Sequence, residues 1–274
     1  MRIRSFVRNP AALVGALVLS SLVLACLLVP VLVPHDPYAI DFDQKLQGPS
    51  LSHPLGTDLF GRDLLVRMAV GGQFSLLVAG GALALILALG FLYGSLAGLS
   101  RPAISAGLMR LLDGLIALPR LPVLIVILVV VRLNTNILIL IFTLAVVNWM
   151  LTARLVHYQI VSLRQADFVR AARAIGARPV QVLRRHLLPN TLGILLVAAF
   201  LELPALILAE AFVSVLGLGL NPPTPTWGTI AQDGINQDRT YELVLPSIAI
   251  AMFAVAANFV ADGLQDALQP RRAR

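Results

Sequence analysis

SLRQADFVRAARAIGARPVQVLRRHLLPN, residues Ser162–Asn190, is a charged stretch between two strongly apolar parts of the chain. Because it carries too many charges to sit in lipid, the apolar parts on either side are expected to be membrane helices that it connects outside the bilayer. We call it the amphipathic segment. Spacings of i, i+3, i+4 and i+7 within it predict one apolar face of an α-helix, formed by Phe168, Ala171, Ala172 and Ile175.

The amphipathic segment is expected to contain two short helices. Gly176 is placed to end the first helix, and Pro179 stands near the start of the second. Small residues on the apolar face favour close contact with a partner in the water phase. A solvated linker between two membrane helices is the alternative interpretation.

The composition is that of a polytopic membrane protein. Of the 274 residues, 58% are hydrophobic and only 13% are charged, and the mean hydropathy is +0.86. A soluble domain would carry about a quarter charged residues. The net charge of +7 does not indicate nucleic-acid binding, because the basic residues flank apolar spans as topology determinants do.

Six membrane spans are expected, and the fold class is an all-α polytopic membrane protein. The spans run at about Ala11–Val33, Phe74–Leu99, Gly107–Val131, Ile137–Val156, Thr191–Val215 and Val244–Leu268. The third is the weakest, because Asp113, Pro119, Arg120 and Pro122 interrupt it.

The distribution of arginine predicts the orientation of these spans. With six spans, most basic residues fall on one side of the membrane, which is then the cytoplasmic side. Both termini and the amphipathic segment are expected there. Two loops are expected on the opposite side: Pro34–Gln73, the long loop, and Gly217–Leu243, the proline-rich loop.

Several catalytic and nucleotide-binding motifs are absent from the sequence. Lys45 is the only lysine, so no GxxxxGK[ST] phosphate loop exists and any ATP-driven work needs a separate polypeptide. The four histidines form no known metal-ligand spacing, and no GxSxG motif occurs. We therefore expect no enzyme activity, no bound metal and no cofactor in this chain.

Polar residues within the spans are candidates for a translocation path. Glu202 and Glu210 lie roughly 80° apart around one helix. They are expected either to line a polar path, together with Asn258, or to pair with an intramembrane arginine such as Arg120 or Arg154.

A glycine row in the second span predicts a close helix contact. Gly90, Gly94 and Gly98 recur every four residues, so they share one helix face and allow another helix to approach closely. Packing within the chain is favoured over a subunit interface.

The amphipathic segment resembles the EAA loop of ABC-importer permeases, whose pattern is E-A-A-x3-G-x9-I-x-L-P. Matching positions are Ala171, Ala172, Gly176, Leu188 and Pro189. Arg170 stands in place of the glutamate, and His186 in place of the isoleucine.

Four further stretches resemble the dipeptide/oligopeptide subfamily of these permeases, the DppC/OppC type. They are RNPAALVGALVL (Arg8–Leu19), LGTDLFGRDLLVR (Leu55–Arg67), LGLGLNPPTPTWG (Leu216–Gly228) and ADGLQDALQPR (Ala261–Arg271). Together they cover nearly the whole chain in order.

The resemblance implies a type I importer fold, with an added N-terminal helix and loop in residues 1–73 and a five-helix core in residues 74–274. The core would contain a cytoplasmic coupling loop, residues 157–190. The resemblance assigns ATPase coupling to Asp167, Phe168, Arg170, Ala171, Ala172, Ile175, Gly176, Ala177, His186 and Pro189.

The resemblance also implies the partners: a second, non-identical permease, two cytoplasmic ABC ATPases that bind ATP and Mg²⁺, and an extracytoplasmic solute-binding protein. The chain would reside in a bacterial inner membrane. We expect the two loops to contact the binding protein through Asp58, Arg62, Asp63, Pro223 and Trp227.

Two other functions compete with that of a peptide-importer permease. One is a self-sufficient secondary transporter or channel that uses Glu202 and Glu210 for protons, and the other is a membrane scaffold without transport. The sequence does not distinguish dipeptides, longer peptides, glutathione, nickel or a metal chelate as the solute.

Overall fold

The computed structural model describes residue 6 and residues 9–131 and 136–268, and every regular element in these ranges is a helix. The long helices are α2 (Pro10–Leu32), α3 (Leu64–Leu99), α4 (Pro102–Ile116), α5 (Arg120–Val131), α6 (Ile137–Leu163), α9 (Leu188–Val215) and α11 (Thr240–Leu268). The short ones are η1 (Phe42–Gln44), α7 (Asp167–Ala174), α8 (Pro179–Val182), the π-helical turn η3 (Leu183–Leu187) and α10 (Trp227–Asn236).

Among the described residues, five helices are long and apolar enough to cross a membrane, and six crossings result if α4 and α5 form one broken span. The third predicted span, which was expected to be the weakest, is broken: α4 and α5 meet at a bend of 79°. Pro119 lies in the break and Pro122 in the first turn of α5. A proline has no amide proton for the helix hydrogen bond and disfavours helical backbone in the residue before it, so two prolines this close together favour a break.

The second span begins earlier than predicted. Asp63 caps α3 by accepting a hydrogen bond from the amide of Val66, so the helix starts at Leu64 and not at Phe74. The long loop therefore ends at Asp63. The proline-rich loop also contains a helix that the sequence analysis missed, α10, which Thr226 and Thr229 begin with a reciprocal capping box.

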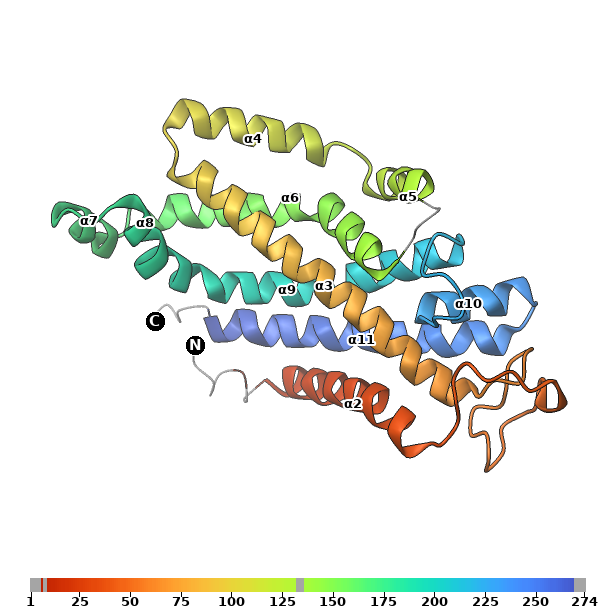
Figure 1. Cartoon of the computed structure of the whole chain (residues 1–274). Helices are drawn as coiled ribbons and strands as arrows, with labels where there is room; N and C mark the ends of the chain where they lie inside the picture. Colours follow the sequence, from red (N-terminus) through yellow and green to blue (C-terminus); the bar gives the residue numbers. More distant parts are fainter. Residues whose placement is uncertain (1–5, 7–8, 132–135, 269–274) are drawn as a thin grey trace.

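The centre of the molecule is a bundle in which α3 crosses α6 and α9, and α11 lies between α9 and α2 (Figure 1). The glycine row of α3 lies directly on α6. A Cβ atom at Gly94 would come within 2.7 Å of Val156 Cβ, and one at Gly98 within 2.7 Å of Ile160 Cγ2. The prediction that this row packs within the chain is confirmed.

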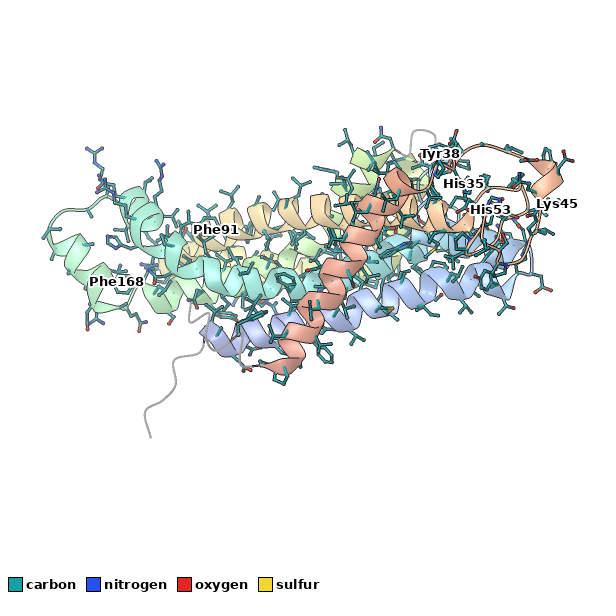
Figure 2. All side chains as sticks on the ribbon, turned by 90° about the horizontal axis from the view of Figure 1, so that it is seen from below. His35, Tyr38, Lys45, His53, Phe91 and Phe168 are labelled. Atoms are coloured by element: carbon teal, nitrogen blue, oxygen red, sulfur yellow. The ribbon has the colours of Figure 1, made fainter. Side chains whose placement is uncertain are left out.

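The bundle has two different ends (Figure 1). The segment end carries α7 and α8, and the loop end carries the long loop and α10. Figure 2 shows the same division, with Phe168 at one end and His35, His53 and Lys45 at the other. The start of α2 and the end of α11 lie together at the segment end, where Asn9 Nδ2 donates to Asp266 Oδ2 at 3.1 Å.

Candidate functional site

The first helix of the amphipathic segment, α7, has apolar residues on two faces. Val169 and Ala172 are buried against the chain itself, at 0% and 7% exposure. Phe168, Ala171 and Ile175 point away from the bundle, and Ile175 is 88% exposed. The prediction of a single apolar face is therefore wrong for Ala172. The i, i+3, i+7 spacing of the other three residues leaves them as one exposed stripe, which we call the α7 stripe.

A glycine-dependent turn ends α7. Gly176 has φ of +86°, a conformation that glycine adopts without strain, and Ala177 N donates to Ala172 O at 3.0 Å. This is the 6→1 hydrogen bond of a Schellman motif. Nothing lies within 4 Å of a Cβ placed at Gly176, so its backbone conformation and not crowding accounts for the glycine.

The amphipathic segment is fixed to the membrane helices through its buried side chains. Val182 and Leu187 are fully buried and pack in one cluster with Val156 and Ile160 of α6. Arg164 Nη1 also donates to the carbonyl oxygen of Gly98 at the end of α3. These contacts connect the amphipathic segment to the ends of α3, α6 and α9.

Most of the other residues predicted for coupling are also exposed. Asp167, Arg170 and Pro189 are exposed, and His186 is half-buried with its ring centroid 6.1 Å from that of Phe168. Arg178, Arg184 and Arg185 are exposed as well. The segment end thus presents an exposed apolar stripe together with several exposed arginines.

Glu210 does not line an open path in this structure. Its side chain is fully buried, and its two carboxylate oxygens accept from Ser75 Oγ at 3.0 Å and Ser214 Oγ at 2.8 Å. No ion pair with an arginine is formed by Glu210 among the described residues. The hydrogen bond to Ser75 joins α9 to α3, and the predicted pairing of Glu210 with an arginine is not found.

Glu202 lies in a different environment. It is half-buried on α9, and no ion pair joins it to Arg120 or Arg154 among the described residues. Arg120 Nη1 lies 3.5 Å from Asn148 Oδ1 of α6. Arg154 pairs with Asp113 instead. Asn258, the third predicted path residue, is exposed on α11.

At the loop end, the carboxylate of Asp58 accepts hydrogen bonds that hold the turn within LGTDLFGRDLLVR. Asp58 Oδ1 accepts the amides of Phe60 at 2.8 Å and Arg62 at 3.0 Å. Asp58 Oδ2 accepts Arg62 Nε at 2.6 Å and lies 3.3 Å from Arg67 Nε. Asp58 is 2% exposed and Arg67 3% exposed, so this ion pair is internal.

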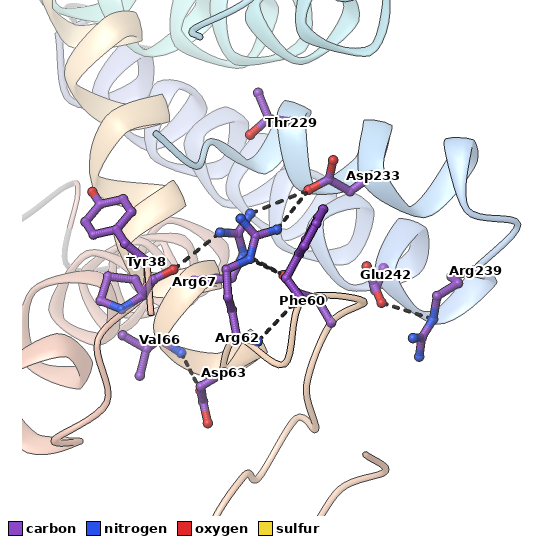
Figure 3. A network of polar contacts seen from close by, with 12 residues as sticks. Tyr38, Phe60, Arg62, Asp63, Val66, Arg67, Thr229, Asp233, Arg239 and Glu242 are labelled. Atoms are coloured by element: carbon purple, nitrogen blue, oxygen red, sulfur yellow. Dashed lines mark hydrogen bonds and ion pairs between the residues drawn. The ribbon is translucent and has the colours of Figure 1, made fainter. Parts of the chain in front are cut away.

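The ion pairs of this turn extend to α10 (Figure 3). Arg67 Nη2 lies 3.5 Å and Arg62 Nη2 3.8 Å from Asp233 Oδ2. Burial raises the pKa of the Asp233 carboxyl above its ordinary value, and the two arginines oppose that rise. Two carboxylates and two guanidinium groups, which we call the four-charge cluster, thus hold the long loop, α3 and α10 together.

Three residues predicted to contact a binding protein are internal. Asp58 and Asp63 are 2% and 3% exposed, and Trp227 is 1% exposed with its Nε1 donating to Met68 O at 3.1 Å. The expectation that they form an accessible surface is corrected, because each is used in packing or hydrogen bonding within the chain. Pro223 is exposed and Arg62 half-buried.

Sequence reasoning missed one cluster of possible metal ligands. Ligand atoms of His35, His53 and Asp63 lie within 4.8 Å of one another. Asp63 is 28 residues from His35 and 10 from His53, so no short motif joins them. The only signal available in the sequence was that both histidines stand in one loop of an otherwise histidine-poor chain.

Comparison with known proteins identifies two family matches. Residues 90–274 match the family described as binding-protein-dependent transport system inner membrane component. Residues 1–49 match the N-terminal transmembrane domain of oligopeptide transport permease C.

Individual relatives are similar over nearly the full chain. The dipeptide transport system permease protein DppC of Bacillus subtilis is 35% identical over 274 residues, 99% of this chain and 85% of the relative. The oligopeptide transport system permease protein OppC of Haemophilus influenzae is 35% identical over 272 residues, 98% of this chain and 87% of the relative. OppC of Salmonella typhimurium is 36% identical over 272 residues, covering 98% and 89%.

Proposed function

The chain belongs to the binding-protein-dependent transport system inner membrane component family, and from this premise we propose that it takes up di- or oligopeptides by coupling its α7 stripe to an ATPase. The resemblance predicted from the sequence is confirmed, and the chain is a multi-pass permease subunit of an ATP-driven importer, not an enzyme. The peptide substrate rests on the names of the relatives and is proposed here for this chain.

The observation that carries the coupling proposal is the exposed α7 stripe. Phe168, Ala171 and Ile175 are apolar, share one helix face and are exposed, although the ring of Phe168 also lies near that of His186. At the end of a membrane helix bundle, outside the lipid, exposed apolar side chains at this spacing fit a groove on a soluble partner. The surrounding arginines favour a groove with an acidic rim.

The attachment of the amphipathic segment gives the coupling its mechanical basis. Val182 and Leu187 pack on α6, so closure of the ATPase pair would move α7, α8 and the adjoining helix ends as one body. Rigid-body movement of packed helices is an established way to switch between two states. We propose that the permease alternates in this manner between inward-open and outward-open forms.

Ala171→Glu tests the coupling directly. A charge on the exposed stripe leaves the chain's own core intact but places an unpaired carboxylate in the proposed contact. We expect normal membrane insertion, loss of peptide uptake by more than ten-fold and loss of substrate-stimulated ATP hydrolysis. The control is Gln165→Glu, which places the same charge on an exposed residue outside α7. Normal uptake by Ala171→Glu would refute the proposed docking face.

The orientation of the chain follows from the same assignment. We place the segment end, with the start of α2 and the end of α11, in the cytoplasm of a bacterium, and the loop end outside the inner membrane. The concentration of arginine at the segment end supports this placement. The exposed parts of the long loop, and Pro223 of the proline-rich loop, then face the solute-binding protein.

A second, non-identical permease completes the proposed complex, together with two ATPases. One copy of this chain has few polar groups within its spans, and Glu210 and Asp113 are already used in internal contacts. Transport paths in membranes are commonly built between two halves. Native mass spectrometry of the complex expressed from its whole operon is expected to show one copy of each permease; a transport-competent homodimer would contradict this.

The burial of Glu210 argues against a proton-driven transporter. If Glu202 and Glu210 carried protons, uptake would stop when the proton gradient is collapsed and would not need the ATPases. The coupling proposal predicts the reverse: uptake into vesicles persists with an uncoupler as long as ATP is supplied on the ATPase side.

A further inference from the structure

Three side chains from separate parts of the long loop meet at the loop end. His35 follows the end of α2, His53 lies in the middle of the loop, and Asp63 caps α3. His53 Nδ1 lies 2.7 Å and His35 Nδ1 3.2 Å from the same atom, Asp63 Oδ2. The two imidazole rings are 4.8 Å apart, and Figure 2 shows both labelled side chains within this loop.

The hydrogen bonds around these atoms fix the roles of the ring nitrogens. Asp63 Oδ1 already accepts the Val66 amide at 2.9 Å, so Oδ2 alone faces the imidazoles. His53 Nε2 lies 2.6 Å from Gln44 Oε1, a carbonyl oxygen that can only accept. When Nε2 is the donor to Gln44, the Nδ1 atom of a neutral His53 presents a lone pair to the carboxylate.

Two lone pairs 2.7 Å apart repel each other, so this contact requires a positive charge between the atoms. A single cation shared by His35 Nδ1, His53 Nδ1 and Asp63 Oδ2 would supply this charge to all three ligand atoms at once. Asp63 is buried, with its side chain 1% exposed, whereas the His35 side chain is 32% exposed. The cluster is therefore closed toward the bundle and open toward solvent at His35.

We propose that His35 Nδ1, His53 Nδ1 and Asp63 Oδ2 bind a divalent transition-metal ion of the Zn²⁺ type. Two imidazole nitrogens and one carboxylate oxygen form a common ligand set for Zn²⁺, with water in the fourth position. Bonds of about 2.0–2.2 Å in a tetrahedral arrangement hold the ligand atoms about 3.3–3.5 Å apart. The distance of 3.2 Å from His35 Nδ1 to Asp63 Oδ2 fits this range, and the distance of 2.7 Å from His53 Nδ1 to Asp63 Oδ2 must lengthen slightly.

Gln44 supplies the outer contact that such a site needs. A metal-bound histidine usually donates its other ring N–H to a carboxylate or carbonyl oxygen, which fixes the ring orientation. His53 does so to Gln44. The bound ion would tie the end of α2, the middle of the long loop and the start of α3 to one point, beside the four-charge cluster.

The test is Zn²⁺ binding to the full chain, purified in detergent with a tag that contains no histidine. Competition of Zn²⁺ with a chromophoric chelator is expected to show one tight site per chain. His35→Gln and His53→Gln are each expected to weaken it at least ten-fold, and Gln44→Ala by about 10–100-fold. Affinity should fall on acidification, because the ligands must lose their protons. Co²⁺ in the same site should show the visible absorption of tetrahedral coordination.

Matched variants separate site loss from general effects. His186→Gln, at the segment end, and Asp43→Asn, an exposed carboxylate of the same loop, are expected to bind Zn²⁺ as the unaltered chain does. His35→Gln changes a partly exposed residue and is expected to fold, so it remains informative if His53→Gln does not. The proposal would be overturned if the unaltered chain had no tight site, or if His35→Gln and His53→Gln bound Zn²⁺ as tightly as the unaltered chain does. The contacts would then be ordinary hydrogen bonds.

Discussion

The two ends of this permease use their family motifs in opposite ways. At the segment end, Phe168 and Ile175 are left exposed although they are apolar. At the loop end, Asp58 and Arg67 are buried although they are charged. Exposure of apolar groups and burial of charged groups both cost free energy, so each end departs from the usual arrangement for a reason of its own.

The difference shows that a specific motif need not be a contact surface. The segment-end motif leaves an apolar stripe exposed, which we propose binds the ATPase. The loop-end motif, LGTDLFGRDLLVR, satisfies its charged groups within the chain and fixes the shape of the long loop. Mutations at the loop end should therefore act on stability first, and mutations in the α7 stripe on coupling first.

The largest stability effect is expected for Asp58→Ala. The substitution removes the acceptor of two backbone amides and leaves the buried Arg67 with the partly exposed Asp233 as its nearest carboxylate. Breaking a buried ion pair costs about 3–5 kcal/mol. Thermal unfolding of the detergent-purified chain should shift strongly downward, whereas Asp43→Ala, in an exposed part of the same loop, should leave Tm nearly unchanged. Equal Tm values for the two variants would contradict the view that the loop-end motif acts mainly on stability.

An intermediate effect is expected for Gly176→Ala at the segment end. The backbone there has φ of +86°, and a side chain in the left-handed region costs roughly 1–2 kcal/mol. Since nothing surrounds the position, the cost is local and should loosen the end of α7. Hydrogen exchange of the α7 amides should speed up while Tm of the bundle stays close to that of the unaltered chain. Gly114→Ala, at an uncrowded helical position, is the control, and equal exchange in both variants would contradict the account.

The smallest effect is expected for Asp233→Asn, at the outer edge of the four-charge cluster. The side chain is 35% exposed, and ion pairs of such groups contribute about 0–1 kcal/mol. The effect should also depend on pH. Because the pKa of Asp233 is raised in the fold, the folded chain takes up this proton before the unfolded chain does.

The unaltered chain should therefore gain stability over Asp233→Asn as the pH falls from the raised pKa of Asp233 in the folded chain to the ordinary pKa of an aspartate. This gain is lost again as the pH rises through the raised pKa. Paired Tm measurements of the two proteins across mildly acidic to neutral pH check this. If the Tm of the unaltered chain minus that of Asp233→Asn decreases on acidification, the arginines and not burial determine the pKa of Asp233.

Much of the fold was predictable from the sequence because lipid imposes long apolar helices with few alternatives. The glycine row and five of the spans were predicted for this reason. The break between α4 and α5 was not, since the interrupting residues Pro119 and Pro122 do not reveal whether a helix bends or ends. The start of α3 was misplaced because the charge of Arg67 indicated a loop. Only the structure shows that Arg67 is buried against Asp58 within a helix.

The sites were predictable only in part. Spacing identified the face of α7, but it did not separate Ala171 from Ala172, because the choice depends on which side packs against α6 and α9. Glu210 was considered a path residue because intramembrane carboxylates are rare, yet Ser75, distant in sequence, satisfies it. The His35, His53 and Asp63 cluster also depends on long-range folding of the loop.

Site-specific crosslinking from the two ends tests the central claim most directly. Cys26 is the only cysteine, so a Cys26→Ala background allows single cysteines at Ala171 and, as the matched position at the loop end, at Ser52. Both residues are exposed. With a photoactivatable thiol reagent on the transport-competent complex, the account predicts an ATPase adduct from position 171 and none from position 52. No ATPase adduct from position 171, or equal adducts from both positions, would contradict it.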